Sequence, residues 1–331
     1  GPMPNESGVL VVGEFGDDAL TGITAELLGA AHRVVDVLGG KASAALLGEG
    51  AGSVAPAAIA AGADRVYVAE SPELTPFTPD AWVPALQQIV AEAGPAVVLI
   101  GQTSIGRDLG PHLAFRLGTG VAMDTLELTV RDGRVVMTRA CFGGNAREEV
   151  VVTGSPQIAT VRAKSQEPLE ADAGRRGETV QVSLSLNPAE IKESVIERTK
   201  AKAEGVRLED ANIVVSGGRG LGAPEGFRLV EELAGVLGGA VGASRAACDL
   251  GWYPPSQQVG LTGKTVSPDL YVAVAISGAS QHWAGMAGSK NVVAINKDPD
   301  ANMVKAARFA VVGDYKQVLP ALVEAVRELK N

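Results

Sequence analysis

The stretch Asn212-Ile213-Val214-Val215-Ser216-Gly217-Gly218-Arg219-Gly220-Leu221-Gly222-Ala223 passes from an apolar strand into a glycine-rich loop. The residues that follow, 225–237, repeat apolar side chains at helical spacing and predict an amphipathic helix. A buried strand, a glycine-rich turn and a helix in this order open a doubly wound α/β domain. The spacing Gly218-x-Gly220-x-x-Ala223 is that of a dinucleotide fingerprint. The sequence therefore predicts a Rossmann-like domain in the last third of the chain.

The same alternation continues outward to the C-terminus. Strands are predicted at residues 270–276, 292–296 and 309–312, and helices near residues 281–287, 302–307 and 318–328. Strands separated by helices at this spacing form a parallel sheet that is covered on both faces. We expect this second domain to span residues 206–331.

Polar residues directly follow several of these strands. They lie in four segments, at residues 218–223, 258–264, 276–282 and 294–298. Ligands of open α/β sheets bind outside the carboxyl ends of the strands, so the four segments are predicted to line one crevice. The segment that contains Ser277, Gln281 and His282 offers backbone amides and side-chain donors to an anion.

The fingerprint leaves an alternative function open. An NAD(P)-dependent dehydrogenase uses such glycines to bring the backbone close to a pyrophosphate at a helix N-terminus. The acidic residue that usually binds the NAD ribose after the next strand is absent, and Gly242-Ala243-Ser244-Arg245 stands there instead. In this alternative, Arg245 contacts a 2′-phosphate.

The first half of the chain also alternates between strands and helices. Strands are predicted at residues 9–14, 33–38, 65–69 and 96–101, and helices at residues 21–31, 53–60 and 80–93. A hairpin is predicted around Arg131-Asp132-Gly133, and two more strands, at residues 149–153 and 157–162, are expected to extend it. Antiparallel strands attached to a parallel sheet commonly lie at its edge.

The predicted fold class is therefore α/β, with two doubly wound domains. The first domain, residues 4–205, has a nucleotide-binding-like sheet with antiparallel edge strands. Its last part, residues 165–205, is charged and irregular and is expected to be a linker, because residues 167–172 and 174–178 offer little apolar surface to bury. Within it, residues 179–186 are strand-like and residues 191–205 are charged.

Composition excludes several functional classes. The chain of 331 residues has 29 Lys and Arg against 38 Asp and Glu, a net charge of −9, which argues against a nucleic-acid partner. The two cysteines and three histidines have no metal-ligand spacing, so no metal site is expected. No apolar run is long enough for a membrane span, so we expect a soluble, cytoplasmic protein without membrane insertion. We find no catalytic acid–base pair or nucleophile.

Several motifs resemble one known family, the α subunits of electron transfer flavoproteins. In the second domain they are Val215-Ser216-Gly217-Gly218-Arg219-Gly220-Leu221, Gly242-Ala243-Ser244-Arg245-Ala246-Ala247, Tyr271-Val272-Ala273-Val274-Ala275-Ile276-Ser277-Gly278-Ala279-Ser280-Gln281-His282 and Val293-Ala294-Ile295-Asn296-Lys297-Asp298-Pro299. In the first domain they are Gln102-Thr103-Ser104-Ile105-Gly106-Arg107-Asp108-Leu109 and Phe142-Gly143-Gly144-Asn145-Ala146. The resemblance spans nearly the whole chain.

This resemblance implies an electron carrier rather than an enzyme that converts a substrate. Members of the family hold FAD in a C-terminal Rossmann-like (DHS-like) domain and form a heterodimer with a β subunit, which we expect the first domain to dock. The resemblance also implies electron donors such as acyl-CoA or other flavoprotein dehydrogenases, a quinone oxidoreductase or another acceptor, and a setting in fatty acid oxidation. It leaves open whether electrons are bifurcated and whether the β subunit holds AMP or a second FAD.

The family's cofactor-binding residues can be transferred to this chain by motif. The resemblance implies that Ser244 and Arg245 lie at the isoalloxazine, Thr262 near its N5 and His282 near its pyrimidine ring. It further implies that Gln258, Ser277 and Gln281 serve the ribityl chain or pyrophosphate, and that Asn296 and Asp314 serve the adenosine end. The other expected cofactor contacts are Arg219, Gly220, Gly260, Gly263, Gly278 and Ala279.

Three residues depart from the family's pattern. Leu261 stands where the family usually has Gln, Ser280 where it has an apolar residue, and Trp283 where it has Leu.

Two charges are expected at the flavin site. Arg245 offers a fixed positive charge to reduced flavin, with an ion pair to Asp249 as the structural alternative, and His282 is expected to add a pH-dependent charge.

Overall fold

The structure is a computed structural model, and it describes residues 7–16, 19–142, 146–197 and 206–330. The chain forms two compact units. Residues 7–141 and 146–197 belong to the first domain and residues 206–330 to the second. The expected end of the linker, residues 198–205, and Gly143-Gly144-Asn145 of one family motif lie outside the described residues.

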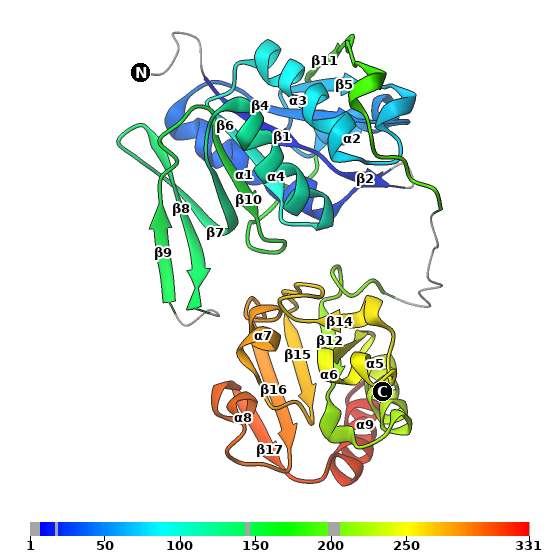
Figure 1. The fold of residues 1–331 in the computed structure, drawn as a ribbon. Coiled ribbons are helices and arrows are strands. Elements are labelled where there is room, and N and C mark those ends of the chain that lie inside the picture. Colours follow the sequence, from blue (N-terminus) through cyan, green and yellow to red (C-terminus); the bar gives the residue numbers. More distant parts are fainter. Residues whose placement is uncertain (1–6, 17–18, 143–145, 198–205, 331) are drawn as a thin grey trace. The chain divides into compact units, whose positions relative to one another are not determined.

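The first domain contains a nine-stranded sheet among the described residues. In spatial order its strands are β11 (Glu178–Gln181), β5 (Arg65–Ala69), β4 (Ala42–Leu47), β1 (Val9–Val12), β6 (Val97–Gly101), β10 (Gln157–Val161), β7 (Val121–Arg131), β8 (Arg134–Cys141) and β9 (Ala146–Val150). The strands from β11 to β7 are parallel, whereas β8 and β9 are antiparallel and lie at one edge (Figure 1). The predicted parallel sheet with antiparallel edge strands is confirmed.

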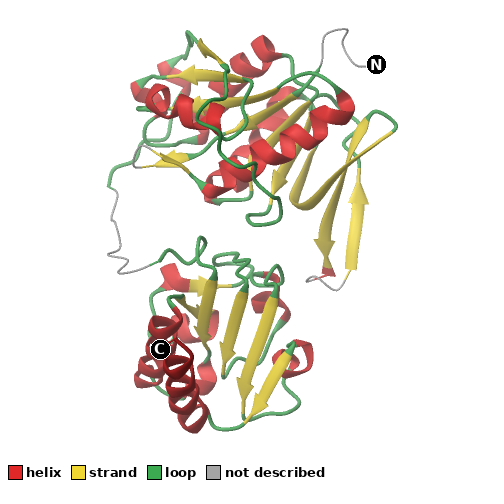
Figure 2. Cartoon of the chain, turned by 180° about the vertical axis from the view of Figure 1, so that it is seen from behind, coloured by secondary structure: helices red, strands yellow, loops and turns green. Residues whose placement is uncertain are grey.

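Helices cover both faces of this sheet (Figure 2). Helices α1 (Gly22–Leu38) and α2 (Ala51–Ala60) pack on one face, with Val9 and Val11 of β1. Helices α3 (Pro79–Ala93) and α4 (Ser104–Leu117) pack on the other face, with Leu10 and Val12. Successive strand residues thus serve opposite cores, as the period of a strand requires. The short strands β2 (Phe15–Gly16) and β3 (Ala19–Leu20) form a separate antiparallel pair.

The strand predicted at residues 33–38 is wrong, because these residues form the end of α1. The apolar run resembles a strand, yet its buried side chains continue the helical stripe of the preceding turns: Ala30, Ala31 and Val34 are buried, while Val37 is 67% exposed. The strand that follows is β4, which starts at Ala42.

Two expectations for the end of the first domain are also wrong. Strand β10 pairs with the hairpin strand β7, but it is parallel to β7 and is inserted between β6 and β7, so it is not an antiparallel edge strand. The described part of the expected linker is not a free connection, because β11 pairs with β5 and residues such as Val182 and Leu184 pack on the core. From Val180 to Leu186 every second residue is apolar and half-buried, while the residues between them are exposed.

The second domain contains a six-stranded sheet among the described residues, and its strands are all parallel. In spatial order they are β14 (Gln258–Val259), β13 (Ala240–Ser244), β12 (Ile213–Gly217), β15 (Leu270–Val274), β16 (Asn291–Asn296) and β17 (Phe309–Val312). Helices α5 (Phe227–Leu237), α6 (Arg245–Asp249) and α9 (Tyr315–Lys330) contribute to one core, and α7 (Ser280–Ala284) and α8 (Asn302–Ala306) to the other. The predicted doubly wound fold is confirmed.

Both domains are wound in the same way around their first strand. The order β5-β4-β1-β6 in the first domain corresponds to β14-β13-β12-β15 in the second. In each domain the second and third strands are added on one side of the first strand, and the fourth strand is added on its other side. The strand order therefore reverses beside the first strand, which is where ligands of such sheets bind. Among the described residues, no helix is long and apolar enough to cross a membrane.

Candidate functional site

The loops that follow strands β12 to β17 form what we call the carboxyl edge of the second domain. Every cofactor-binding residue predicted from the sequence lies there. Arg219 and Gly220 follow β12; Ser244 ends β13 and Arg245 begins α6; Gln258, Gly260, Thr262 and Gly263 lie in and after β14; Ser277, Gly278, Ala279, Gln281 and His282 follow β15; Asn296 ends β16; and Asp314 follows β17. The parallel strands therefore bring these residues to one edge of one sheet.

The glycine-rich loop after β12 is packed against the end of β15. The amides of Gly218 and Gly220 donate to the carbonyls of Val274 and Ala275, at 2.9 and 3.2 Å. A Cβ on Gly218 would lie 2.3 Å from the Ala275 carbonyl oxygen. Helix α5 begins at Phe227, after two short 3-10 turns. The fingerprint interpretation is therefore wrong, because close packing explains these glycines and their amides are not directed at a ligand.

In the loop after β15, unlike in the glycine-rich loop after β12, consecutive backbone amides have no hydrogen-bond partner in the described chain. Within the described chain, the amides of Ser277, Gly278 and Ala279 donate to no other protein group. The side chains of Ser277, Ala279 and Gln281 are exposed. Gly278 has a φ of +80°, and a Cβ there would lie 2.4 Å from the Met303 nitrogen, so this position requires glycine. Three consecutive unpaired amides are suited to binding an anionic group.

The loop after β14 brings a second set of predicted residues together. Gln258 Nε2 donates to Thr262 Oγ1 at 2.9 Å. The Leu261 amide donates to the carbonyl of Gln281 at 2.7 Å, which joins this loop to α7. Gly263 lies against Gln258, whose carbonyl oxygen would be 2.4 Å from an added Cβ. Leu261 itself is 62% exposed, so its departure from the family pattern lies at the surface of the domain.

Ser244 and Arg245 lie beside this loop, because β13 pairs with β14 and Ser244 is in register with Val259. Ser244 Oγ accepts a hydrogen bond from the Ala247 amide at 3.4 Å and caps α6. Arg245 forms an ion pair with Asp249, with 3.4 Å between Nε and Oδ2, and both side chains are about two-thirds exposed. The structural alternative for Arg245 is thus present, but an ion pair this exposed holds the guanidinium weakly.

His282 is the only one of the predicted side chains at this edge that is buried. Its Nε2 lies 2.9 Å from the hydroxyl of Tyr271, and its Nδ1 is buried without a hydrogen bond of ordinary length. Burial lowers the pKa of His282 to about 4, against a smaller raising effect of the Val259 backbone. The expected pH-dependent charge is therefore wrong, because the ring is neutral at pH 7.

A cavity of about 230 Å³ opens at the other end of the carboxyl edge. It is lined by Gly220, Ala275, Ile295, Asn296, Lys297, Asp298, Gly313 and Tyr315. Asn296 Nδ2 donates to the Ile276 carbonyl at 3.0 Å, so its amide also fixes two neighbouring strand ends. Asp314 forms an ion pair with Lys297 at 3.0 Å and accepts the Lys316 amide. These two contacts hold the pKa of Asp314 below its ordinary value.

Sequence reasoning missed two residues of this edge. Lys297 lines the cavity beside Asn296, and Tyr271 contacts His282 from inside strand β15. A signal for Tyr271 was present, because a tyrosine in an otherwise apolar buried strand needs a partner for its hydroxyl. A lysine after a strand carries no comparable signal, since most such side chains are simply solvated.

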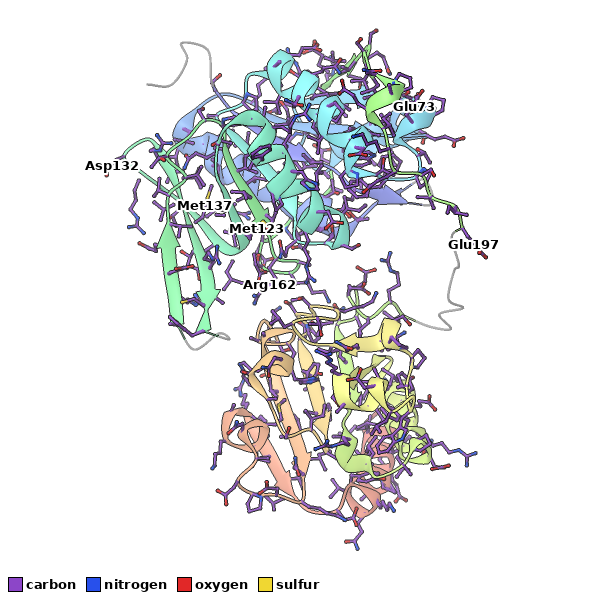
Figure 3. All side chains as sticks on the ribbon, in the orientation of Figure 1. Glu73, Met123, Asp132, Met137, Arg162 and Glu197 are labelled. Carbon is purple, nitrogen blue, oxygen red and sulfur yellow. The ribbon has the colours of Figure 1, made fainter. Side chains whose placement is uncertain are left out.

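The carboxyl edge of the first domain differs from that of the second. Thr103 Oγ1 donates to Glu14 at 2.7 Å, and Gln102 bonds Thr160. Arg162, labelled in Figure 3, makes a two-pronged contact with Asp124 and is buried. The polar side chains at this edge thus bond one another.

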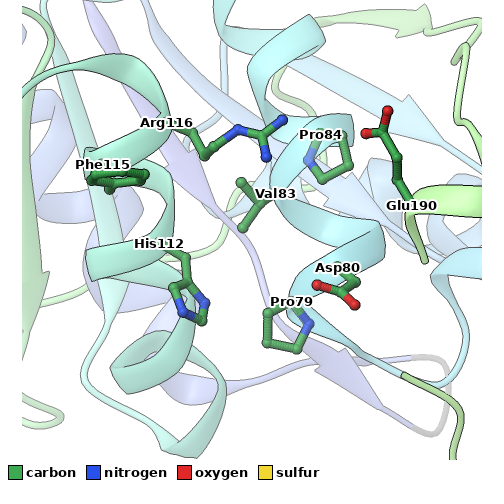
Figure 4. A pocket seen from close by; sticks show the side chains of 8 residues that line it. All are labelled: Pro79, Asp80, Val83, Pro84, His112, Phe115, Arg116 and Glu190. Carbon is green, nitrogen blue, oxygen red and sulfur yellow. The ribbon is translucent and has the colours of Figure 1, made fainter. Parts of the chain in front are cut away.

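The first domain has a separate hollow of about 240 Å³ between α3 and α4. Figure 4 shows its lining residues, Pro79, Asp80, Val83, Pro84, His112, Phe115, Arg116 and Glu190. It lies on the helical layer and not at the strand ends, and Phe115 is 83% exposed. In neither domain do the described residues gather His, Cys, Asp and Glu into a cluster that could hold a metal ion.

Comparison with known families agrees with both domains. The model of the electron transfer flavoprotein domain matches residues 9–187, and that of the electron transfer flavoprotein FAD-binding domain matches residues 207–287. The relatives include "Electron transfer flavoprotein subunit alpha" of Thermoanaerobacterium thermosaccharolyticum, 40% identical over 99% of this chain and 100% of the relative. Proteins of the same description from Bacillus subtilis and Mycobacterium tuberculosis are 41% and 42% identical over 97% and 98% of this chain, and 98% and 99% of their own lengths.

FAD is therefore the cofactor of this chain. The residues at the carboxyl edge fit such a ligand. Unpaired amides lie at residues 277–279, a cavity lies beside Asn296, and a buried ring nitrogen of His282 has no hydrogen bond. A long cofactor with an anionic middle and hydrogen-bonding ends matches this distribution of groups.

Proposed function

This chain belongs to the family of electron transfer flavoprotein α subunits, and from that membership we propose that it carries electrons as one half of a heterodimer with a β subunit. Flavoprotein dehydrogenases, acyl-CoA dehydrogenases among them, supply the electrons, and a quinone oxidoreductase or another acceptor receives them. Fatty acid oxidation is the setting that this role predicts. FAD supplies the redox chemistry, while the protein supplies position and electrostatics.

The observation that carries this proposal is the set of unpaired donors at the carboxyl edge of the second domain. The amides of Ser277, Gly278 and Ala279 bind the pyrophosphate, and the exposed amide side chain of Gln281 lies beside them. Gln258 and Thr262, already joined by a hydrogen bond, contact the ribityl chain and the isoalloxazine. Asn296 and Asp314 bind the adenosine end next to the cavity.

Arg245 gives the isoalloxazine a fixed positive charge. A guanidinium does not lose its proton at working pH, and the ion pair with Asp249 leaves about two-thirds of the side chain exposed. His282 is neutral and contributes a hydrogen bond, not a charge. The remaining contacts, Arg219, Gly220, Gly260 and Gly263, shape the loops on which these side chains stand.

The first domain serves as a docking domain for the β subunit. Its carboxyl edge is closed by internal bonds such as Thr103 to Glu14 and Arg162 to Asp124, which leaves few groups for a ligand. Phe115 on α4 of this domain is 83% exposed and provides apolar surface for a protein partner.

The test is to produce the chain together with a β subunit and to record visible spectra of the purified complex. A heterodimer that contains tightly bound yellow FAD, and whose flavin is reduced by a dehydrogenase with its substrate, supports the proposal. A colourless protein that ignores the β subunit at micromolar concentration contradicts it. Titration with NADH and NADPH without a dehydrogenase tests the alternative, because a pyridine-nucleotide dehydrogenase binds one of them tightly.

A further inference from the structure

One ion pair holds the base of the loop after β14, the loop that carries Gln258 and Thr262. The Lys264 ammonium contacts the Glu209 carboxylate, and each side chain is about one-third exposed. Glu209 belongs to the turn at residues 207–210, ahead of β12, so the pair joins segments that are 55 residues apart in the chain. The segment with which the second domain begins is thereby connected to a loop of the candidate site.

The turn that carries Glu209 is itself held in place. A backbone hydrogen bond of 3.1 Å closes it, and Leu208 and Ala211 on either side of the turn's end are each 2% exposed. Both belong to the core cluster that contains Val259 of β14. The Glu209 side chain therefore extends from a packed backbone to the loop.

The loop is closed at the residue that makes the ion pair. The Lys264 amide donates to the Gln258 carbonyl at 2.7 Å, and the Lys264 carbonyl accepts the Gly260 amide at 3.2 Å. The Gly263 amide donates to the Gly260 carbonyl at 3.0 Å, and the side chains of Gln258 and Thr262 are joined at 2.9 Å. A displacement of Lys264 therefore moves the two side chains that the proposed function places at the flavin.

The other attachments of the loop hold only its first half. Val259 is in register with Ser244 of β13, and the Leu261 amide donates to the Gln281 carbonyl at 2.7 Å. Among the described residues, the polar contacts of residues 262–264 stay within the loop, apart from the ion pair. The second half of the loop, with Thr262, is thus tied to the rest of the domain through Lys264.

Folding stability does not explain this ion pair. A pair that is partly exposed to water contributes little to folding. One carboxylate oxygen, Glu209 Oε2, is buried without a hydrogen bond in the described chain, and such burial costs free energy of desolvation. Two neutral side chains of similar size would avoid this cost. What the pair supplies is a defined position for Lys264.

We propose that Lys264 and Glu209 are positioning residues for the flavin: their ion pair holds the loop after β14 in the conformation that presents Gln258 and Thr262 to it. This inference rests on the proposed placement of FAD at this edge. Both residues act through the loop, because Lys264 lies at its base and Glu209 lies outside it.

The first test is hydrogen exchange in the flavin-free full chain, read by mass spectrometry on peptides that cover residues 258–264. Lys264→Met removes the charge and keeps a long apolar side chain. We expect its loop amides to exchange about tenfold faster than in wild type, with peptides from β12 and β15 unchanged. Lys264→Arg keeps the charge and should restore slow exchange. The matched control is Lys290→Met, since Lys290 pairs with Asp269 at 2.8 Å but both side chains are more than half exposed.

The second test is the FAD affinity of the folded chain, measured by equilibrium dialysis together with the visible circular dichroism of the bound flavin. We expect Lys264→Met and Glu209→Gln each to weaken binding about tenfold, and the double variant no more than either one, because both remove the same interaction. An ion pair that served stability alone would lower the unfolding midpoint of the flavin-free chain and leave the affinity and the dichroism unchanged.

The outcomes separate this inference from the proposed function. A loop that exchanges as slowly in Lys264→Met as in wild type overturns the inference, and so does a mobile loop in a variant that binds FAD as wild type does. A wild type that binds no FAD, with a loop that still loosens in Lys264→Met, keeps the positioning of the loop and contradicts the FAD site. If Lys264→Met does not fold, Glu209→Gln, which is nearly the same shape as wild type, decides both tests.

Discussion

The two domains share one winding and differ in what their carboxyl edges do with their polar groups. In the first domain Thr103 bonds Glu14 and Arg162 bonds Asp124, so the groups at the strand ends hold one another. In the second domain the amides of residues 277–279 are unpaired, and Arg245 and Gln281 are exposed. The same strand order thus carries polar groups that bond one another in the first domain and polar groups that are available to a ligand in the second. Fold alone does not assign the ligand; the loops do.

The domains also differ in their buried titratable groups, and this gives the largest expected effect. The pKa of His282 is about 4 when folded and 6.5 as its ordinary value. Between these values the unfolded chain binds a proton that the folded second domain does not, so stability falls as pH falls from 6.5 to 4. The loss is about 1.4 kcal/mol per pH unit and roughly 3 kcal/mol in total. Denaturant titrations of flavin-free protein, followed by Trp252 and Trp283, measure it, and His282→Gln should abolish the slope.

The first domain should respond to pH in the opposite direction. Burial raises the pKa of Glu26 from 4.5 to about 7, although the Lys164 amide opposes the rise. Between these values the folded domain keeps a proton that the unfolded chain has lost, so stability rises as pH falls from 7 to 4.5. We expect roughly 2 kcal/mol, less than for His282 because Glu26 is less deeply buried. Trp82 reports this domain, and Glu26→Gln is the control; a parallel slope for both domains would contradict the comparison.

One closely packed glycine beyond a strand end in each domain tests whether packing or ligand binding explains such glycines. An added Cβ would lie 2.3 Å from the Ala275 oxygen at Gly218 and 1.7 Å from the Gly101 oxygen at Gly106 of the first domain. We expect Gly218→Ala and Gly106→Ala each to destabilise its own domain by about 2 kcal/mol in the absence of FAD. Thermal unfolding of the flavin-free variants is the measurement. A Gly218→Ala protein of unchanged stability that loses only FAD would restore the fingerprint interpretation.

Asp314 tests the adenosine end of the site. Asp314→Ala should release FAD about tenfold more readily, because the adenosine end loses an acceptor and the cavity-lining Lys297 loses the ion pair that holds it. The flavin that remains after extended dialysis is the readout. Asp300→Ala is the matched control, since Asp300 also pairs with a lysine at 3.0 Å, but that lysine, Lys305, does not line the cavity. Equal flavin loss in both variants would refute the assignment.

Arg245 should give the smallest effect. Arg245→Ala is expected to weaken FAD binding about threefold and Arg245→Lys less, because the lysine keeps the charge but not the planar group. Asp249→Ala frees the guanidinium from its exposed ion pair and should leave FAD binding unchanged. Equilibrium dialysis compares the three variants. If Asp249→Ala weakens binding as much as Arg245→Ala, the residue acts through the ion pair and not on the flavin.

The sequence predicted the second domain better than the first, for physical reasons. Strands β12, β15 and β16 are short apolar runs between glycine-rich turns, and such runs identify buried parallel strands. The end of α1 was mistaken for a strand because residues 33–38 are apolar at both helical and extended spacing. The place of β10 depends on pairing with β6 and β7, residues far away in sequence, which no local pattern records.

For the candidate site, the position of the loops was predicted from local sequence patterns, whereas the contacts between segments distant in sequence were not. The loops that carry Ser277, Gln281 and Asn296 were predicted at the carboxyl edge, because the ends of parallel strands must meet there. The hydrogen bond from the Gly218 amide to the Val274 carbonyl was not predicted, since it depends on how closely the loop after β12 approaches the end of β15. The neutral state of His282 was missed for the same reason, because its burial is set by Tyr271 and the loop after β14.

The most direct test of the central claim compares one bulky substitution at the two carboxyl edges. Ala279 and Ser104 are both exposed and both follow the fourth strand of their winding, β15 and β6. The FAD content of the purified complex, read from its visible absorbance per mole of protein, is measured for Ala279→Trp and Ser104→Trp. The account predicts that Ala279→Trp loses most of its flavin while Ser104→Trp keeps a full complement. Full flavin in Ala279→Trp, or loss in Ser104→Trp alone, would contradict it.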